Sequence, residues 1–292
     1  MKISTEIGSI SRKVGDRKAV EYVAKAGFDA WDFSMFSVTT YDWSIKSAVV
    51  NESNPLNGAN YLAYARELRK IGEDLGITCN QSHAPFPTSN PVVADRICRC
   101  IEATAEAGGK ICIVHPDNNK TAEENAEFYL KLLPFAKGCG VKIATENMWN
   151  WNCETNIAAP AACSDPKSFL EHIIAVNDEY FVACLDIGHA EMQGLNTSSP
   201  EMIKALGNHL QALHIHDNDL LHDSHQIPFS MNIDFKAMTD ALCEIGYKGY
   251  LTLEADAYLH NHTAENTFEG VCDLALSAKR LREMMPNCKT AE

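Results

Sequence analysis

The sequence predicts an α/β protein, a single-domain (β/α)8 barrel over residues 1–292. Three observations favour this fold. Apolar strand-like runs alternate with amphipathic helical runs along the whole chain, and eight alternations fit into 292 residues. Acidic and imidazole side chains recur where the strand-like runs end. No Gly-x-Gly-x-x-Gly motif follows the first run, which argues against a dinucleotide-binding open sheet.

Each predicted strand is a short apolar run, and several follow a glycine that is typical of a helix end. Helix starts are indicated at Asn90, Asp165 and Ser199, each of which is followed by proline. Thr121 and Glu124 have the spacing of a capping box. The predicted strands are Lys2–Ile7, Phe28–Phe33, Ile77–His83, Lys110–His115, Val141–Glu146, Phe181–Asp186, Gln211–His216 and Tyr250–Glu254.

Composition excludes several classes of protein. The formal net charge of −14 argues against a nucleic-acid partner, because phosphate binding depends on Lys and Arg. No run approaches the roughly 18 apolar residues of a membrane span, and the N-terminus leads directly into a strand without a signal peptide. The 11 cysteines are scattered and form no Cys-x-x-Cys motif. We therefore expect reduced thiols and a cytoplasmic protein without a membrane partner.

Two long loops are expected at the barrel mouth, over residues 34–60 and 147–164. The first carries Tyr41 and Trp43, and the second carries Trp149 and Trp151. Aromatic side chains at such positions could wall a ligand pocket. They could equally pack on the barrel rim or on another subunit, so a homo-oligomer stays an open alternative.

Side chains that bind metals recur at the predicted strand ends. Active sites of (β/α)8 barrels lie at the C-terminal ends of the strands, and a buried carboxylate must be paired or must bind a metal. Their repetition at one structural position predicts a single polar, metal-binding mouth. The residues are His83, His115, Glu146, Asp186, His189, His214, Asp223, His225 and Glu254.

The segments that carry these residues together resemble the xylose isomerase-like barrel superfamily. That group contains sugar and sugar-phosphate isomerases and epimerases, dehydratases and the endonuclease IV enzymes. The resemblance covers nearly the whole chain, and its most specific parts are the Asp-x-x-His of residues 186–189 and the His-x-x-Asp of residues 214–217. The other segments are Ser82-His83-Ala84-Pro85, Ile113-Val114-His115-Pro116, Ala144-Thr145-Glu146-Asn147, His222-Asp223-Ser224-His225 and Leu251-Thr252-Leu253-Glu254.

The resemblance implies one divalent metal that is held by Glu146, Asp186, His214 and Glu254. Independently, three carboxylates and one imidazole suit Mn²⁺, Mg²⁺, Co²⁺ or Zn²⁺. His216 has the same strand parity as His214, but we choose His214 because it precedes Asp217 by three residues, as the family's ligand precedes its acid. His216 is assigned a supporting or core role.

The same resemblance implies a reaction. In the epimerases that the chain resembles, the residues that match Glu146 and Glu254 take and return a proton next to a carbonyl, through an enediolate intermediate. The expected substrate is a small sugar or polyol. We lean to an unphosphorylated one, because no Gly-rich or basic phosphate signature follows the last two strands. The residues expected to contact the substrate are His189, His115, His83 and His225.

Other readings of the same residues stay open. His83, His115, His189, Asp223 and His225 match further metal ligands of endonuclease IV, so the chain could bind more than one Zn²⁺ and act as a phosphodiesterase. A metal-dependent dehydratase that acts on a sugar- or polyol-derived ketone would use the same proton abstraction. For two further residues, Asp32 is either a mouth residue or structural, and His222 is interpreted as a solvated loop residue.

Overall fold

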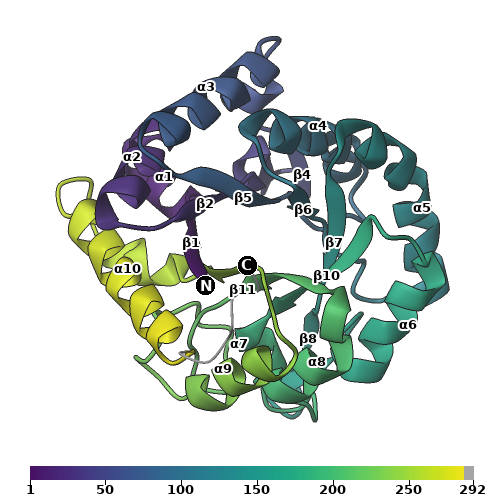
Figure 1. The fold of residues 1–292 in the computed structure, drawn as a ribbon. Coiled ribbons are helices and arrows are strands. Elements are labelled where there is room, and N and C mark those ends of the chain that lie inside the picture. Colours follow the sequence, from purple (N-terminus) through teal and green to yellow (C-terminus); the bar gives the residue numbers. More distant parts are fainter. Residues whose placement is uncertain (286–292) are drawn as a thin grey trace.

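Eight parallel strands close into a barrel in this computed structural model, which describes residues 1–285 (Figure 1). From β1 to β11 each strand pairs with the next barrel strand along the chain, and β12 pairs with β1. A backbone bridge between Ile215 and Leu253 joins β11 to β12. The predicted barrel is confirmed. Its strands are β1 (Lys2–Glu6), β2 (Ala30–Ser34), β5 (Thr78–His83), β6 (Ile111–Ile113), β7 (Lys142–Glu146), β10 (Phe181–Asp186), β11 (Leu210–His214) and β12 (Tyr250–Leu253).

Helices surround the barrel and cover its outer face (Figure 1). Large side chains such as Trp31, Phe33 and Phe169 are fully buried, and they belong to the core cluster that joins the strands to this outer layer. The helices are α1 (Gly8–Val14), α2 (Asp16–Ala26), α3 (Tyr61–Asp74), α4 (Pro91–Ala107), α5 (Ala122–Cys139), α6 (Pro166–Val176), α7 (Ile187–Ala190), α8 (Ser199–Leu206), α9 (Phe235–Glu244) and α10 (Thr267–Glu283). Short 3-10 helices are Phe36–Val38, Pro55–Asn57, Gly207–His209 and Asp256–Asn261.

Most of the predicted helix starts are present. The side chains of Asn90 and Asp165 accept hydrogen bonds from backbone N–H groups in the first turns of α4 and α6. Thr121 and Glu124 form the predicted capping box at the start of α5. The cap expected at Ser199 is wrong by one residue. Ser199 is already helical, and its hydroxyl donates to Glu191 instead of capping.

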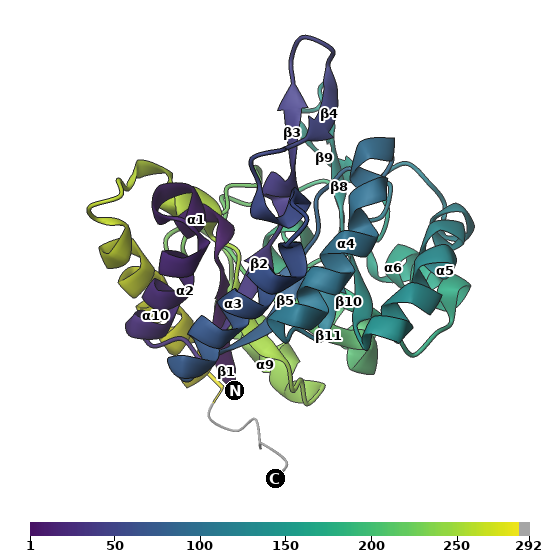
Figure 2. The same cartoon turned by 90° about the horizontal axis from the view of Figure 1, so that it is seen from above.

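Both segments that were expected to be long loops contain an antiparallel hairpin. The first consists of β3 (Thr39–Asp42) and β4 (Ser47–Val50), and the second of β8 (Trp149–Asn152) and β9 (Ile157–Pro160). Figure 2 shows that β3 and β4 project beyond the C-terminal ends of the barrel strands. Trp43, at the turn of this hairpin, is 82% exposed. The expectation that both segments stand at the mouth holds, but they carry regular structure.

The barrel interior is divided by polarity. A small apolar cluster contains Ala144 and Ala212, which share strand parity with the mouth residues Glu146 and His214. Polar groups in the interior form a chain in which the half-buried Asn80 donates to Thr252 at 3.1 Å and the buried Gln81 donates to Asp32 at 2.8 Å. These hydrogen bonds lead from the N-terminal half of the barrel toward the mouth, where Asp32 contacts His214.

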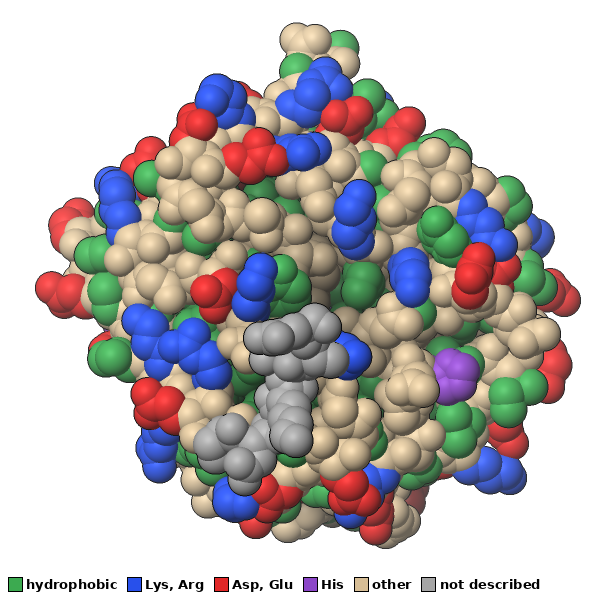
Figure 3. Space-filling view, viewed as in Figure 1, with side chains coloured by type: hydrophobic (Ala, Val, Ile, Leu, Met, Phe, Trp, Pro, Cys, Tyr) green, Lys and Arg blue, Asp and Glu red, His purple; other side chains and the backbone are tan. Residues whose placement is uncertain are grey.

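The N-terminal face of the barrel has a different character. Lys and Arg side chains surround a hollow there (Figure 3), and the cavity of about 670 Å³ at this face is lined by residues that include Lys110, Lys248 and Tyr250. None of its lining residues within the described range 1–285 is His, Asp or Glu. The acids and imidazoles named from the sequence therefore lie away from it. None of the helices in residues 1–285 is long and apolar enough to cross a membrane.

Candidate metal centre and active site

Four of the predicted ligands meet at the barrel mouth. Glu146, Asp186 and His214 are the last residues of β7, β10 and β11, and Glu254 follows β12 directly. One ligand atom from each lies within 4.8 Å of the others. The Nδ1 atom of His214 is 3.0 Å from Glu146 Oε1 and 3.2 Å from Glu254 Oε2. We call these four residues the quartet; binding of a metal to them stays a prediction.

The donor set of the quartet fits a divalent cation. Glu146, Asp186 and His214 have no exposed surface and Glu254 is 6% exposed. Three carboxylates buried at this depth are strongly unfavourable unless positive charge compensates them. Asp186 Oδ2 has no hydrogen-bond partner among residues 1–285. A cation held between these oxygens would compensate the charge and satisfy that atom.

Two histidines extend the quartet on one side. His83 ends β5 and places Nδ1 3.0 Å from Glu254 Oε1, while its Nε2 lies 2.6 Å from Nε2 of His115. His115 Nε2 is also 3.0 Å from Glu146 Oε2. Burial, together with the charge of His214, lowers the pKa of His83 well below its usual range. His83 is thus held in the neutral form that binds metals and accepts hydrogen bonds.

The two glutamates of the quartet are in different electrostatic surroundings. Burial raises the pKa of Glu254 well above its usual range, against the opposing effect of His214 and His225. Burial acts on Glu146 in the same direction, but His214 and His115 outweigh it and hold the pKa of Glu146 well below its usual range. Two carboxyl groups whose pKa values are separated in this way are suited to different roles in proton transfer.

Asp32 orients the imidazole of the quartet. Its Oδ2 atom lies 3.2 Å from His214 Nε2 and accepts a hydrogen bond from Gln81 at 2.8 Å. Because Nε2 is occupied in this way, Nδ1 of His214 faces Glu146 and Glu254. A carboxylate behind a ligating histidine is a common support of metal sites. The structure thus resolves the sequence alternatives for Asp32 in favour of a buried residue at the mouth.

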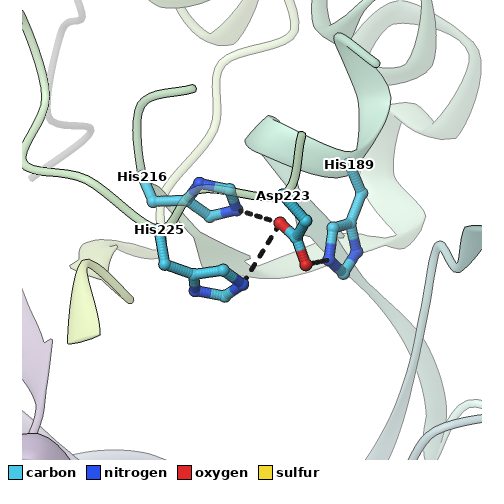
Figure 4. Close-up of side chains that lie close together, drawn as sticks. All are labelled: His189, His216, Asp223 and His225. Atoms are coloured by element: carbon cyan, nitrogen blue, oxygen red, sulfur yellow. Dashed lines mark hydrogen bonds and ion pairs between the residues drawn. The ribbon is translucent and has the colours of Figure 1, made fainter. Parts of the chain in front are cut away.

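A second group of metal-binding side chains lies beside the quartet, and Figure 4 shows how its members converge. Asp223 stands at its centre: Oδ2 is 3.2 Å from His189 Nε2, and Oδ1 is 3.3 Å from His216 Nε2 and 3.2 Å from His225 Nε2. We call these four residues the second cluster. His216 Nε2 is also 3.1 Å from Oδ1 of Asp186, which connects the two groups.

The ring orientations in the second cluster suit a cation. Nδ1 of His189 donates to the carbonyl of Asn147 and Nδ1 of His225 donates to the carbonyl of Glu254, both at 2.8 Å. Each Nε2 therefore faces Asp223. In the described part of the chain, His216 Nε2 and Asp223 Oδ1 have no hydrogen-bond partner although they are 3.3 Å apart. Polar atoms that approach without hydrogen bonding are expected where a metal would lie between them.

The carboxylates and imidazoles of the second cluster shift the pKa values of one another. Burial opposes protonation of His189, but the carboxylates of Asp186 and Asp223 outweigh it and raise its pKa to about 10. Asp223 is half-buried, and its partial desolvation favours the neutral form, yet His189 and His225 hold its pKa well below the usual range. Without a metal, the cluster therefore pairs an ionised Asp223 with protonated imidazoles, and a cation that bound there would have to displace those protons.

Some residues have other roles than the sequence indicated. His216 was assigned a supporting or core role, but its Nε2 atom lies in the second cluster; its shared parity with His214 was the available signal. Asp217 was a candidate to orient an imidazole, yet its carboxylate accepts backbone N–H groups of Met231 and Ile233. As predicted, His222 lies at the surface, where it pairs with an aspartate and stacks on Trp151.

Asn147 is a mouth residue that the sequence analysis did not single out. Its amide nitrogen donates to the carbonyl of Asp186 at 2.9 Å, and its amide oxygen accepts from the Asp186 N–H at 2.8 Å. This reciprocal pair ties the ends of β7 and β10 together, while the Asn147 carbonyl orients His189. Its position directly after Glu146 was the only signal in the sequence.

Aromatic rings stand on both sides of the mouth. The ring of Phe36 is 4.4 Å from that of His83, and the ring of Phe86 is 4.7 Å from that of His115. On the opposite side the ring of Trp149, in β8, is 6.4 Å from that of His189. Trp149 thus lies beside the site, as a pocket wall would, whereas Tyr41 and Trp43 lie at the exposed end of the first hairpin.

Comparisons with known proteins agree with this architecture. The family model for the xylose isomerase-like TIM barrel matches residues 20–274. An uncharacterised protein of Methanocaldococcus jannaschii is 26% identical over 254 residues, which cover 81% of this chain and 78% of that protein. An uncharacterised protein of Sinorhizobium fredii is 25% identical over 149 residues, which cover 51% of this chain and 43% of that protein.

Solved structures share the fold over nearly the full length. A D-tagatose 3-epimerase-like protein has a TM-score of 0.70 at 21% identity, covering 98% of this chain and 97% of that chain. The IolI protein with a bound zinc atom has a TM-score of 0.70 at 17% identity, covering 99% and 100%. The 3-keto-D-glucoside 4-epimerase YcjR of E. coli has a TM-score of 0.67 at 15% identity, covering 97% and 99%.

Proposed function

The chain belongs to the xylose isomerase-like TIM-barrel family, and we propose that it is a divalent-metal-dependent sugar isomerase or epimerase. The observation that carries this proposal is the quartet, in which Glu146 and Glu254 both approach Nδ1 of His214 at the barrel mouth. Sugar epimerases and a zinc-binding protein among the structures of the same fold support the assignment.

The proposed reaction removes a proton from a carbon next to a carbonyl and returns it. A divalent cation in the quartet would stabilise the negative charge that develops on the substrate oxygens. Glu146 and Glu254 are the proposed catalytic residues, one taking the proton and the other returning it through an enediolate. Their opposite pKa shifts support a division of these roles.

Neighbouring imidazoles are proposed to position the substrate. His83 and His115 border the quartet on one side, while His189 and His225 border it on the other. All four rings could form hydrogen bonds with sugar hydroxyls: a neutral imidazole offers one donor and one acceptor, whereas a protonated one, such as His189 with its raised pKa, donates only. We therefore propose a small sugar or polyol as the substrate.

The test is exchange of a substrate C–H with deuterated solvent, followed by NMR on the metal-loaded chain with a panel of ketoses. We expect exchange by the wild type and its loss in Glu254→Gln at saturating metal. Glu269→Gln, at an exposed position of α10, serves as the control and should exchange normally. Undiminished exchange in Glu254→Gln would contradict the catalytic role of Glu254, and no exchange by the wild type with any sugar would contradict the proposed function.

A zinc phosphodiesterase of the endonuclease IV kind is the second candidate, and the second cluster is the observation that favours it. Together with His83 and His115, this cluster could supply ligands for more than one Zn²⁺. The net charge of −14 is unfavourable for a DNA substrate. Elemental mass spectrometry gives the metal content per chain, and cleavage of abasic-site DNA at high zinc content would favour this candidate over the sugar isomerase.

A further inference from the structure

We propose that the cavity beside His115 binds a second sugar ring, so that the substrate is a glycosylated ketose and not a free or phosphorylated monosaccharide. This inference rests on the proposed function and names its substrate class. The cavity has a volume of about 300 Å³, at the lower end of the range for ligand pockets. That volume corresponds to about ten water molecules, which is room for one ring.

His115 connects the cavity to the quartet. His115 lines it, and Nε2 of the same ring lies 3.0 Å from Glu146 Oε2. Its other walls come from the segment after β5, which carries Phe86 and Ser89, from the segment after β6, and from Asn150 in β8. A ligand that reached from Glu146 past His115 would therefore place its far end in this cavity.

Three asparagines give the cavity a polar wall. Asn118 donates to the carbonyl of Trp149 at 3.0 Å and to Oδ1 of Asn150 at 3.3 Å, and Asn150 donates to Oδ1 of Asn119 at 3.1 Å. These bonds hold the amide groups in place. Each amide still has donor or acceptor capacity beyond them, because a primary amide has two N–H donors and an acceptor oxygen with two lone pairs. Oriented amides of this kind suit the mixed donors and acceptors of sugar hydroxyls.

An aromatic ring completes the wall. Phe86 is 49% exposed, and its ring is held between His115 at 4.7 Å and Phe36 at 5.4 Å. An exposed ring fixed beside oriented amides offers an apolar surface to the C–H face of a pyranose. The aromatic ring and the three amides together favour a ligand ring that has one apolar face and several hydroxyl groups.

The charge of the wall disfavours a phosphoryl group. Asp117 is the one ionisable side chain besides His115 that lines the cavity, and none of the lining residues in the described part of the chain is Lys or Arg. Lys120 approaches Asp117 at 3.5 Å but does not line the cavity. A phosphate would meet the carboxylate of Asp117 and find no cation among the lining residues, which favours an uncharged occupant.

An orphaned atom gives a second, independent indication of a ligand. His115 is 5% exposed, and both short contacts of its ring, to His83 and Glu146, are made by Nε2. Within residues 1–285 its Nδ1 atom has no hydrogen-bond partner. A buried polar atom without a partner is unfavourable. Because Nδ1 itself has no exposed surface, a hydroxyl group of the second ring would satisfy it after a small rotation of the His115 ring toward the cavity.

The experiment compares fructose, fructose 6-phosphate and two glycosyl-fructose disaccharides, turanose and lactulose, in the deuterium-exchange assay on the metal-loaded chain. We expect kcat/KM to be at least tenfold higher for a disaccharide than for either monosaccharide. Asn150→Leu and the cavity-filling Ser89→Phe should remove this preference and leave exchange with fructose within twofold of the wild type. Asn208→Leu, on the opposite face of the barrel, is the matched control and should retain the preference.

Equal or faster exchange with fructose or its phosphate would overturn the inference, as would equal slowing of all sugars by Asn150→Leu. Absence of exchange with every ketose would contradict the proposed function itself. Calorimetry then separates the two ideas. Turanose or lactulose that binds the wild type at least tenfold more tightly than Asn150→Leu would still support the second-ring site, and equal binding to both would overturn it.

Discussion

The imidazole of His216 occupies the space next to Gly188, so that a Cβ atom at residue 188 would overlap the ring. Gly188 lies between Asp186 and His189, in the short helix α7. The absence of a side chain there lets His216 come within 3.1 Å of Asp186 Oδ1 and 3.3 Å of Asp223 Oδ1. The geometry of the second cluster therefore depends on a residue that has no ligand atom in its side chain.

Gly188→Ala should disturb both stability and zinc binding. The added methyl group must displace His216, and overpacking of this kind typically lowers the free energy of unfolding by about 1–3 kcal/mol. We expect weaker zinc uptake by the second cluster, measured by titration against a chromophoric chelator, with the quartet still able to bind. Gly138→Ala is the control, because nothing lies within 4 Å of its Cβ position. Equal stability and zinc uptake in the two variants would contradict this role of Gly188.

Asp32→Asn should weaken metal binding by the quartet without unfolding the barrel. The amide can keep the contacts to His214 and Gln81 but lacks the negative charge that makes the imidazole a stronger ligand. Loss of such a supporting carboxylate typically lowers metal affinity about 10–100-fold. Competition titration with Mn²⁺ or Zn²⁺ measures the change. Asp29→Asn, just before the same strand and at its opposite end, should bind metal like the wild type, and an unchanged affinity of Asp32→Asn would exclude the proposed support.

Removal of metal should destabilise the protein. A ligand present at about 1,000 times its Kd stabilises the folded state by about 4 kcal/mol, and each kcal/mol shifts Tm by about 2–4 °C in a domain of this size class. We expect a chelator to lower Tm by roughly 10 °C, as measured by circular dichroism. A Glu146→Ala variant lacks a quartet ligand and should respond much less. A Tm that is insensitive to chelator in the wild type would argue against a resident metal.

Strand ends were the part of this molecule that the sequence could predict. All eight strands are present with ends shifted by at most two residues, because buried parallel strands are short apolar runs between helices. In a closed barrel, the C-terminal ends of those strands meet at one face. The last residues of β7, β10 and β11 and the residue after β12 therefore had to come together, and the quartet does.

Contacts that depend on how far a side chain extends could not be predicted from the sequence. Strand parity placed both His214 and His216 inside the barrel, but it could not show that His216 extends over Gly188 to Asp223. The support of His214 by Asp32 joins residues 182 positions apart. The two hairpins were missed because their strands are exposed or half-buried and lack the apolar runs that identify barrel strands.

Glu6 provides a prediction about pH that does not involve the metal centre. It ends β1, is 5% exposed and accepts hydrogen bonds from the backbone and hydroxyl of Ser9. Burial, assisted by the nearby charge of Asp256, raises its pKa above the usual value of 4.5. A group with a raised folded-state pKa contributes stability that is fully present below its unfolded pKa and is lost as pH rises through its folded pKa.

Glu6→Gln should therefore gain stability relative to the wild type as pH rises from about 4 to 7, because glutamine does not titrate while the buried glutamate must ionise. Urea unfolding of both proteins across this range measures the difference. Glu265→Gln is an informative contrast. Hydrogen bonding to Thr263 lowers the pKa of the exposed Glu265, so Glu265→Gln should lose stability relative to the wild type over the same pH range. A constant difference between Glu6→Gln and the wild type would show that Glu6 has the same pKa in the folded and unfolded states.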